Sequence, residues 1–221
     1  MATRTEPGAE EFVPAHPGSV DDLRAAAGGC RGCHLYRDAT QTVFGAGPGR
    51  AAVVLVGEQP GDVEDRRGAP FVGPAGKVLD RAMAEAGLAR TDAYLTNAVK
   101  HFKHRDTGKR RIHQTPTRTE VVACLPWLVA ELELLRPRFV VALGGTAVKA
   151  LLGPAATISG VRGQLLPWPD AAHHPELFAG AHGRFAATIH PSAVLRAEDR
   201  EALYQGLVAD LALVAHALGD V

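Results

Sequence analysis

Residues 51–62 read AAVVLVGEQPGD, and this stretch decides the fold class. Its first six residues are apolar and rich in valine, so the pattern predicts a short buried strand, ended by Gly57, rather than a helix. Three polar side chains, Glu58, Gln59 and Asp62, follow at once. In open α/β sheets, ligands bind at the carboxyl ends of the strands. The stretch therefore predicts a strand that delivers polar groups to a functional site; a polar turn without chemistry is the alternative.

Three further short apolar runs predict strands over residues 93–96, 139–143 and 185–189. Asn97 follows the first of these runs, and His190 follows the third. Helical segments between the runs imply right-handed parallel crossovers, which bring the strand ends to one edge of the sheet. Glu58, Gln59, Asn97 and His190 are then expected around one crevice. The expected fold class is α/β, a three-layer α/β/α sandwich with a central, mainly parallel four-stranded sheet.

Length and composition fit a single domain. With 221 residues and 46% hydrophobic content, the chain can bury a full core without disulfides or metals. Residues 1–20 mix Pro, Gly, Glu and Ala without periodicity, which predicts a flexible amino-terminal arm. Residues 21–221 are expected to form the single domain. Its predicted helices include residues 20–27, residues 76–86, a segment from Gly144 to about residue 152, and residues 198 to about 218.

Charge and cysteine content limit which partners and which cellular compartment are expected. Lys and Arg together number 24, as do Asp and Glu, so no overall charge attracts the chain to polyanions. Three cysteines is an odd number, and no basic stretch followed by an apolar one opens the sequence. Secretion and a disulfide framework are therefore not expected, and the expected location is the cytoplasm. No apolar run approaches the roughly 20 residues of a membrane helix, so we expect no membrane contact. We also expect the protein to be a monomer.

Cys30 and Cys33 form a Cys-x-x-Cys motif flanked by glycines, ahead of the first predicted strand. This spacing lets two thiolates bind one metal centre, and it also occurs in redox dithiols and among unrelated loop cysteines. A redox pair is typical of a helix start within a thioredoxin-like unit, which this position is not. A metal centre is therefore the favoured interpretation. Cys124 is the third thiol, and His101 is the leading candidate for one more ligand.

Residues 100–118, KHFKHRDTGKRRIHQTPTR, form the densest concentration of basic side chains in the chain. They come directly after the strand end that carries Asn97, so we expect cations and histidines over the mouth of the site. A charge run is commonly a solvated face. This position, with a Phe to stack and an Asn to read a base, favours nucleic acid, whose phosphates pair with basic side chains.

Together these residues resemble the uracil-DNA glycosylase superfamily, specifically its iron-sulfur family-4 enzymes and most closely their UdgX-type relatives. The similarity covers about residues 28–215. The motif GEQPGD over residues 57–62 matches one that lies on the sugar side of a flipped deoxyuridine, and the motif HPS that begins at His190 matches one that approaches the departing uracil. Phe71 matches the aromatic residue that stacks on the base, and Asn97 matches the residue whose amide reads the uracil edge.

Two departures from the ordinary family-4 pattern stand out. Gln59 replaces the Ala that usually follows the motif Glu, and the insertion KRRIHQ over residues 109–114 is absent from those enzymes. The insertion is similar to the signature of UdgX-type proteins, in which the histidine, here His113, captures the sugar covalently. His101 stands where family-4 proteins carry one of four cysteines, with His104 as a nearby alternative. The resemblance thus implies a structural [4Fe-4S] cluster on Cys30, Cys33, His101 and Cys124.

The implied activity is that of a uracil-DNA glycosylase that flips deoxyuridine, cleaves the N-glycosidic bond and becomes linked through His113 to the deoxyribose C1′ in a single turnover. Cleavage builds positive charge on the sugar and negative charge on uracil; Glu58 faces the first, and a hydrogen bond from His190 stabilises the second. Asn97 offers a donor and an acceptor to the uracil edge. For Gln59, contact with the phosphate and contact with the nucleophile are both open.

The expected partner is uracil-containing DNA, preferably single-stranded, where flipping costs less. The residues expected to bind uracil or DNA are Gly57, Asp62, Phe71, Asn97, Lys109, Arg110, Arg111, Gln114 and Ser192. The adjacent cations of the insertion are also expected to lower the proton affinity of His113. Two alternatives stand beside this hypothesis: a hydrolytic family-4 enzyme with turnover, and a non-enzymatic iron-sulfur protein that binds single-stranded DNA.

Overall fold

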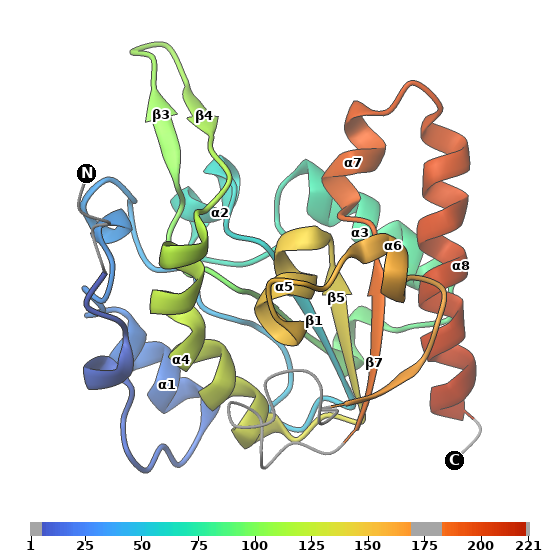
Figure 1. Ribbon diagram of the computed structural model, residues 1–221, viewed down its shortest axis with the longest axis horizontal. Helices are drawn as coiled ribbons and strands as arrows, with labels where there is room; N and C mark the ends of the chain where they lie inside the picture. Colours follow the sequence, from blue (N-terminus) through green and yellow to red (C-terminus); the bar gives the residue numbers. More distant parts are fainter. Residues whose placement is uncertain (1–5, 169–182, 220–221) are drawn as a thin grey trace.

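The computed structural model describes residues 6–168 and 183–219. Its centre is a five-stranded sheet in the order β2-β1-β5-β7-β6 (Figure 1). The four predicted strands are present and parallel: β1 (Val53–Gly57), β2 (Ala93–Asn97), β5 (Phe139–Leu143) and β7 (Gly183–Thr188). A fifth strand, β6 (Leu166–Trp168), pairs antiparallel with β7 at the edge. It was not predicted, because three residues around a proline carry no strand pattern.

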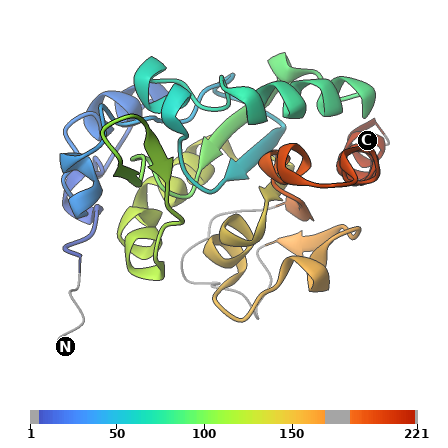
Figure 2. The same ribbon diagram turned by 90° about the horizontal axis from the view of Figure 1, so that it is seen from above.

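Helices cover both faces of this sheet, which confirms the predicted three-layer fold (Figure 2). The covering helices are α1 (Val20–Ala27), α3 (Pro74–Glu85), α4 (Arg118–Leu135), α5 (Gly145–Leu152), α7 (Pro191–Arg196) and α8 (Arg200–Gly219). Val54 and Val56 of β1 pack into a core cluster with α1, α4 and α5. Val53 and Leu55 point the other way, into a cluster with α3, α7 and α8. A strand apolar on both faces is what a sheet covered on both sides requires.

Local capping determines where several helices begin. The Ser19 side chain accepts a hydrogen bond from the Asp22 amide at 3.2 Å at the start of α1. Thr117 and Glu120 form a capping box at the start of α4. These contacts satisfy amides that a helix start leaves unpaired. α3 begins at Pro74, two residues before the predicted start, because proline suits the first turn of a helix.

Within the described residues, α8 is the one helix that is long and apolar enough to cross a membrane by length and composition. It buries Tyr204, Leu207, Leu211 and Val214, and it contacts α3, α7 and β7. This spacing is that of one apolar face, so α8 is an outer-layer helix of the fold. The remaining short elements are η1 (Glu10–Phe12), η2 (His34–Arg37), α2 (Asp62–Arg67), η3 (Arg90–Asp92) and α6 (Ile158–Val161).

The basic stretch contains a β-hairpin where the sequence predicted only a loop. β3 (His104–Asp106) and β4 (Arg111–His113) pair antiparallel, and the hairpin projects beyond the sheet (Figure 1). His104 lies opposite His113, and Gly108 at the tip has a φ of 75° that glycine tolerates. Strands of three residues, with Ile112 as their one apolar side chain, are too short to show an apolar alternation, so the hairpin left no sequence signal.

Residues 6–9 at the amino-terminal end of the described chain contact the domain, while the flexibility expected of residues 1–20 stays a prediction. The Gly8 amide donates to the Gly32 carbonyl at 2.9 Å. Glu6 accepts hydrogen bonds from the amide and the ring Nδ1 of His34, at 3.0 and 2.5 Å. These partners belong to the Cys-x-x-Cys loop and its neighbour, and composition cannot reveal such a contact. Residues 1–5 of the expected arm and residues 220–221 of the expected domain lie outside the described residues.

Candidate active site

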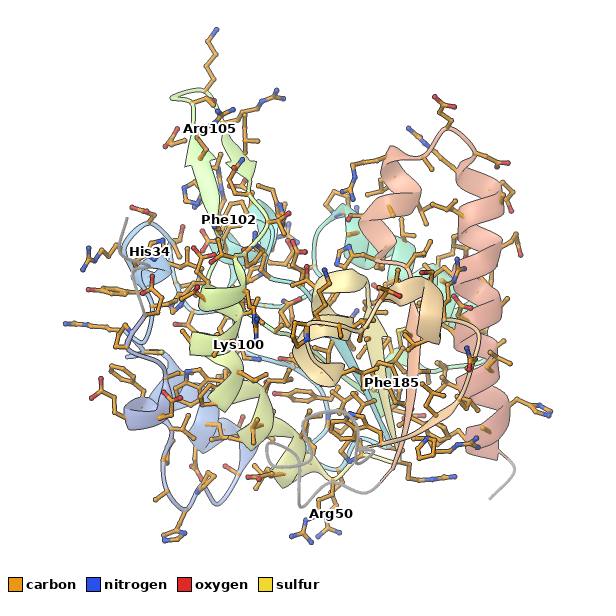
Figure 3. The ribbon with its side chains drawn as sticks, in the orientation of Figure 1. His34, Arg50, Lys100, Phe102, Arg105 and Phe185 are labelled. Atoms are coloured by element: carbon orange, nitrogen blue, oxygen red, sulfur yellow. The ribbon has the colours of Figure 1, made fainter. Side chains whose placement is uncertain are left out.

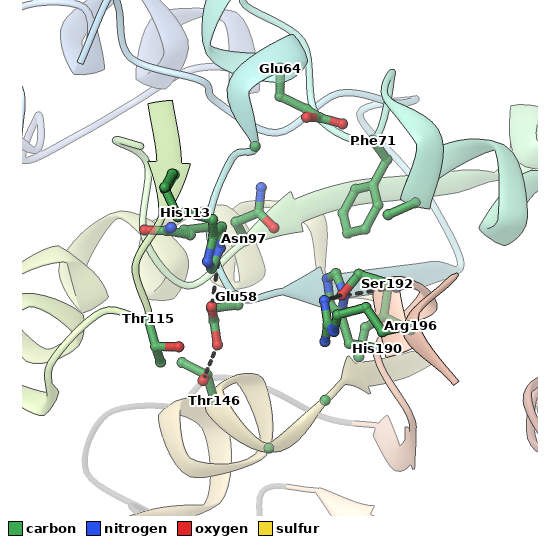
Figure 4. A pocket seen from close by; sticks show the side chains of 17 residues that line it. Glu58, Glu64, Phe71, Asn97, His113, Thr115, Thr146, His190, Ser192 and Arg196 are labelled. Atoms are coloured by element: carbon green, nitrogen blue, oxygen red, sulfur yellow. Dashed lines mark hydrogen bonds and ion pairs between the residues drawn. The ribbon is translucent and has the colours of Figure 1, made fainter. Parts of the chain in front are cut away.

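The carboxyl ends of β1, β2, β5 and β7 open into one pocket with a volume of about 630 Å³ (Figure 4). Parallel register brings these ends together, with Gly57 opposite Asn97 and Leu143 opposite Thr188. The predicted site residues that line the pocket are Glu58, Gln59, Phe71, Asn97, His113, His190 and Ser192. The expected crevice therefore exists, and His113 reaches it from the hairpin.

Glu58 is the first side chain after β1 and lies between His113 and Thr146 (Figure 4). Its Oε1 is 3.4 Å from Nε2 of His113, and its Oε2 accepts a hydrogen bond from the Thr146 hydroxyl. One carboxylate oxygen is thus held by α5, and the other faces the imidazole. A carboxylate in this position can orient the ring and take up a proton from it.

His113 is a neutral imidazole at pH 7. Burial lowers the pKa of His113 below its usual 6.5; the Glu58 carboxylate opposes this effect, and the Arg196 charge adds to it. The contact with Glu58 therefore joins a carboxylate to a neutral ring. This result corrects the expected cause, because the lowering comes from burial and Arg196 rather than from the adjacent cations of the insertion. A neutral ring retains the lone pair that a nucleophile needs.

His190 is held in one tautomer at the start of α7. Its Nδ1 accepts a hydrogen bond from the Ser192 amide at 3.2 Å and lies 2.7 Å from the Ser192 hydroxyl. Because Nδ1 accepts, the proton of the neutral ring is on Nε2. Burial lowers the pKa of His190 to about 4, and the charge of Arg196, together with that of His113 when His113 is protonated, adds to the effect. His190 is therefore a neutral N–H donor at the pocket, as stabilisation of a developing anion requires.

Asn97 ends β2 with a side chain directed at the pocket. It is 2% exposed, and among the described residues its Oδ1 has no hydrogen-bond partner. Gly57 makes room for it, since a Cβ there would lie 2.4 Å from this oxygen and 2.7 Å from the Phe71 ring. A buried acceptor without a partner is unfavourable, so the oxygen is suited to accept from a ligand. Phe71 and Asn97 thus form a slot with one aromatic wall and one hydrogen-bonding edge.

Gln59 holds both strands of the hairpin at their base. Its Nε2 donates to the carbonyls of Lys103 and Gln114 at 3.2 and 3.1 Å, and its Oε1 accepts from the Lys103 amide at 3.0 Å. Gln114 in turn donates its side-chain amide to the His113 carbonyl at 3.1 Å. The side chain of Gln59 therefore binds the segment that carries His113 rather than the His113 ring, and its contact with a phosphate stays a prediction.

Arg111 anchors the hairpin to α2. Its side chain is 14% exposed, and it donates to Asp62 at 2.5 Å and to Asp65 at 2.6 Å. Arg111 and Asp62, both expected to contact DNA, are thus paired with each other, and their contact with DNA stays a prediction. Lys109 and Arg110 are exposed at the hairpin tip, where a phosphate contact stays a prediction.

Lys100 points into the protein although it begins the basic stretch. It is 1% exposed, and its ammonium donates to Glu131 at 2.6 Å and to the Asn97 carbonyl at 2.8 Å. Figure 3 shows Lys100 in the interior, whereas Arg105 lies on the projecting hairpin. The stretch therefore divides into an inner part that supports the end of β2 and an outer hairpin.

The three cysteines are buried thiols in one core cluster with α1 and α4. Cys30 Sγ accepts from the Trp127 indole at 3.2 Å, and Cys124 Sγ accepts from the Lys100 amide at 3.3 Å. Burial raises the pKa of Cys33 to about 11 and that of Cys124 to about 12. N–H donors of this kind tune thiolates that hold iron-sulfur clusters.

His101 is buried and neutral, because burial lowers its pKa to about 4. Its Nε2 is 2.9 Å from the Thr42 hydroxyl, which itself donates to the Ala27 carbonyl at 2.9 Å. The hydroxyl has one hydrogen, so Nε2 must donate and Nδ1 carries the lone pair that a metal ligand needs. His104 instead stacks on Phe102 in the hairpin, with ring centroids 4.9 Å apart.

The donor set fits an iron-sulfur cluster in its chemistry. Three buried thiols and one imidazole with an unprotonated nitrogen are available. Over residues 6–168 and 183–219, no three Cys, His, Asp or Glu side chains meet closely enough to hold a single metal ion. A four-iron cluster spreads its ligands around a larger core, so they need not meet at one point.

The sequence reasoning missed several residues that line the pocket, among them Glu64, Thr146 and Arg196. Thr146 follows the glycines at the end of β5, so the strand-end rule that selected Asn97 could have selected it. Glu64 and Arg196 lie within helices, and only the packing of α2 and α7 brings them to the pocket.

Comparison with known proteins agrees with this geometry. Residues 44–212 match a family model described as the uracil DNA glycosylase superfamily. The chain is similar to type-4 uracil-DNA glycosylases of Archaeoglobus fulgidus (38% identical over 181 residues, 80% of this chain and 83% of the relative), Pyrobaculum aerophilum (37% over 167 residues, 76% and 80%) and Thermotoga maritima (36% over 173 residues, 78% and 81%). The match includes every strand end of the pocket. The chain therefore belongs to the uracil-DNA glycosylase superfamily.

Proposed function

We propose that the protein excises uracil from DNA and becomes covalently linked to the deoxyribose through His113. Superfamily membership and the type-4 relatives support uracil excision. The observation that carries the covalent step is the neutral imidazole of His113, 3.4 Å from Glu58 at the pocket. The same residue belongs to the KRRIHQ insertion, which resembles the UdgX signature.

Excision breaks the bond between C1′ and the uracil nitrogen, and its electron pair leaves with the base. The sugar gains cationic character, which the Glu58 carboxylate stabilises, and the Nε2–H of His190 donates to the uracil anion. His113 then gives a ring lone pair to C1′, and Glu58 takes up the ring proton. Because C1′ now carries the imidazole, water has no cationic carbon to attack, and each protein molecule reacts once.

Asn97 and Phe71 select the base. Asn97 Oδ1 accepts from the N–H of uracil, and its NH₂ donates to the neighbouring carbonyl. Cytosine presents an acceptor and an amine at these positions, so both contacts are lost with it. The unpartnered Oδ1 and the Phe71 ring beside it support this role.

The proposed substrate is uracil-containing DNA, preferably single-stranded, because an unpaired base leaves its stack at lower cost. Lys109 and Arg110 at the hairpin tip are available to pair with its phosphates. We further propose a [4Fe-4S] cluster on Cys30, Cys33, His101 and Cys124, which would supply cross-links between the amino-terminal loop and α4 rather than reaction chemistry.

A denaturing gel with a single-stranded uracil oligonucleotide tests the covalent step. The wild-type protein should form an adduct that survives heat and detergent, up to one per protein molecule, and none with a thymine oligonucleotide. His113→Ala should form no adduct. His104→Ala is the matched control, because it removes the histidine directly opposite on the same hairpin and should leave the adduct intact.

Other outcomes select the alternatives. An adduct that persists in His113→Ala would assign the nucleophile to another residue, with Glu58 next to test. Uracil release by the wild-type protein with many turnovers and no adduct would support the hydrolytic enzyme. DNA binding that ignores uracil and releases none would support a non-enzymatic protein.

A further inference from the structure

The loop between α2 and α3 holds Phe71 in a conformation that side chains rarely adopt. Phe71 has a φ of 54°, in the left-handed region, and one other non-glycine residue in the described part of the chain shares this property. In this conformation its ring lies over Gly57 and beside Asn97. Left-handed backbone is unfavourable for a bulky residue, so surrounding contacts must maintain it.

Glu64 closes this loop at both ends. Its main-chain carbonyl accepts from the Gly68 amide at 2.8 Å, where the loop begins, and its Oε1 accepts from the Gly73 amide at 2.7 Å, where the loop ends. The side chain is buried at 8% exposure and lies beside Phe71 at the pocket (Figure 4). Glycines make room for the carboxylate, since a Cβ on Gly73 or Gly61 would lie 2.8 or 2.7 Å from its oxygens.

The first turn of α3 closes the loop on a third side. A Cβ on Gly76 would lie 1.9 Å from the Phe71 carbonyl oxygen, so α3 packs directly on the Phe71 main chain. Contacts at both ends and along this side leave the loop little room to relax. Among them, the bond from Gly73 to Glu64 is the one made by a side chain, and so the one that a substitution can remove.

We infer that Glu64 is a positioning residue for Phe71, and that its hydrogen bond from Gly73 keeps the aromatic ring in place before a base arrives. This inference rests on the proposed uracil excision, in which Phe71 stacks on the base. The required property is an acceptor oxygen at residue 64, not a negative charge. Preorganisation of this kind matters because small displacements of a contacting group slow a reaction strongly.

Uracil release under single-turnover conditions is the test, because release is common to covalent and hydrolytic routes. Glu64→Met keeps the length of the side chain and removes the acceptor, and it should slow release about tenfold or more, as should Phe71→Ala. The double variant should be no slower than Phe71→Ala, since residues that act as a unit are not additive. Glu64→Gln keeps an acceptor oxygen and should stay within about threefold of wild type.

Two further measurements separate positioning from general damage. The Gly73 amide should exchange its hydrogen slowly in the wild-type protein and in Glu64→Gln, and faster in Glu64→Met, whatever the activity. Glu85→Met on α3 is the matched control, because Glu85 is an exposed carboxylate paired with Arg81, and it should change neither readout.

Several results would overturn the inference. These are multiplicative losses in the double variant, equal losses in Glu64→Gln and Glu64→Met, or no loss in Glu64→Met. A wild-type protein that releases no uracil would instead contradict the proposed function, and the Gly73 exchange measurement would still report whether Glu64 closes the loop.

Discussion

Two histidines for which we propose opposite roles share one charge state in this pocket. His113 is neutral because of burial and Arg196, and His190 is neutral with a pKa lowered to about 4. Neutrality gives His113 a lone pair to donate, while the tautomer imposed by Ser192 gives His190 a proton to donate. Identical residue types therefore take different roles from their surroundings.

The lowered pKa values of the two histidines predict that adduct formation slows at acid pH because His113, and not His190, gains a proton. Protonation removes its lone pair, so the rate of adduct formation should fall at acid pH as the ring gains its proton, and burial moves this fall to a lower pH than for an ordinary imidazole. His190 stays neutral down to about pH 4. Uracil release by His113→Ser should therefore keep its rate to lower pH than adduct formation does. Rate profiles measured between pH 4 and 8 check this, and identical acid limbs would contradict it.

At the scale of elements, the hairpin β3–β4 acts as an arm fixed at its base. Gln59 binds the chain on both sides of the hairpin, and Arg111 pairs with Asp62 and Asp65 of α2. These contacts bring His113 to Glu58 from an element outside the sheet. The hairpin's own three-residue strands are too short to hold such a position.

Loss of the contacts that Gln59 makes with the foot of the hairpin should slow adduct formation more than uracil release. Gln59→Ala removes three hydrogen bonds to the hairpin and should slow adduct formation about tenfold, since a displaced nucleophile reacts slowly. Glu58, Asn97 and His190 are carried by other elements, so uracil release should change little. The ratio of adduct to free uracil measures both effects in one reaction. A parallel fall of the two would show that Gln59 acts on the pocket as a whole.

At the scale of the whole molecule, the three buried cysteines lie between the amino-terminal segment and the residues that support the end of β2. The amino-terminal segment packs on the Cys-x-x-Cys loop, and Cys124 on α4 receives the amide of Lys100, whose ammonium supports the end of β2. A cluster bound there would stabilise this arrangement, because its ligands are far apart in the unfolded chain.

Anaerobically purified protein should contain iron and sulfide in equal amounts. Cys33→Ala and His101→Ala should lose the cluster and lower Tm by about 5 °C or more, which corresponds to about 2 kcal/mol in a domain of this size. His104→Ala is the control and should retain the metal. Absence of iron, or one equivalent of zinc in its place, would contradict the assignment.

The amino-acid sequence by itself determined the layers and the strand ends. Short apolar runs that end in turn residues are typical of strands in a covered sheet. The four parallel strands β1, β2, β5 and β7 place Glu58, Asn97 and His190 at one edge because these four strands point the same way. These inferences depend on periodicity and polarity, which are local properties of the chain. That histidines of residues 100–118 lie over the site was expected because this stretch follows the strand end at Asn97, and family resemblance then singled out His113 among them.

The tertiary structure alone decided which polar groups pair with one another. Asp62 and Arg111, named from the sequence as DNA contacts, also pair with each other, while Lys100 of the basic stretch is buried against Glu131. Gln59 and Glu64 act on segments that lie beside them only after folding. A side chain's charge is readable from sequence, but its partner depends on long-range packing that brings distant residues within hydrogen-bond distance.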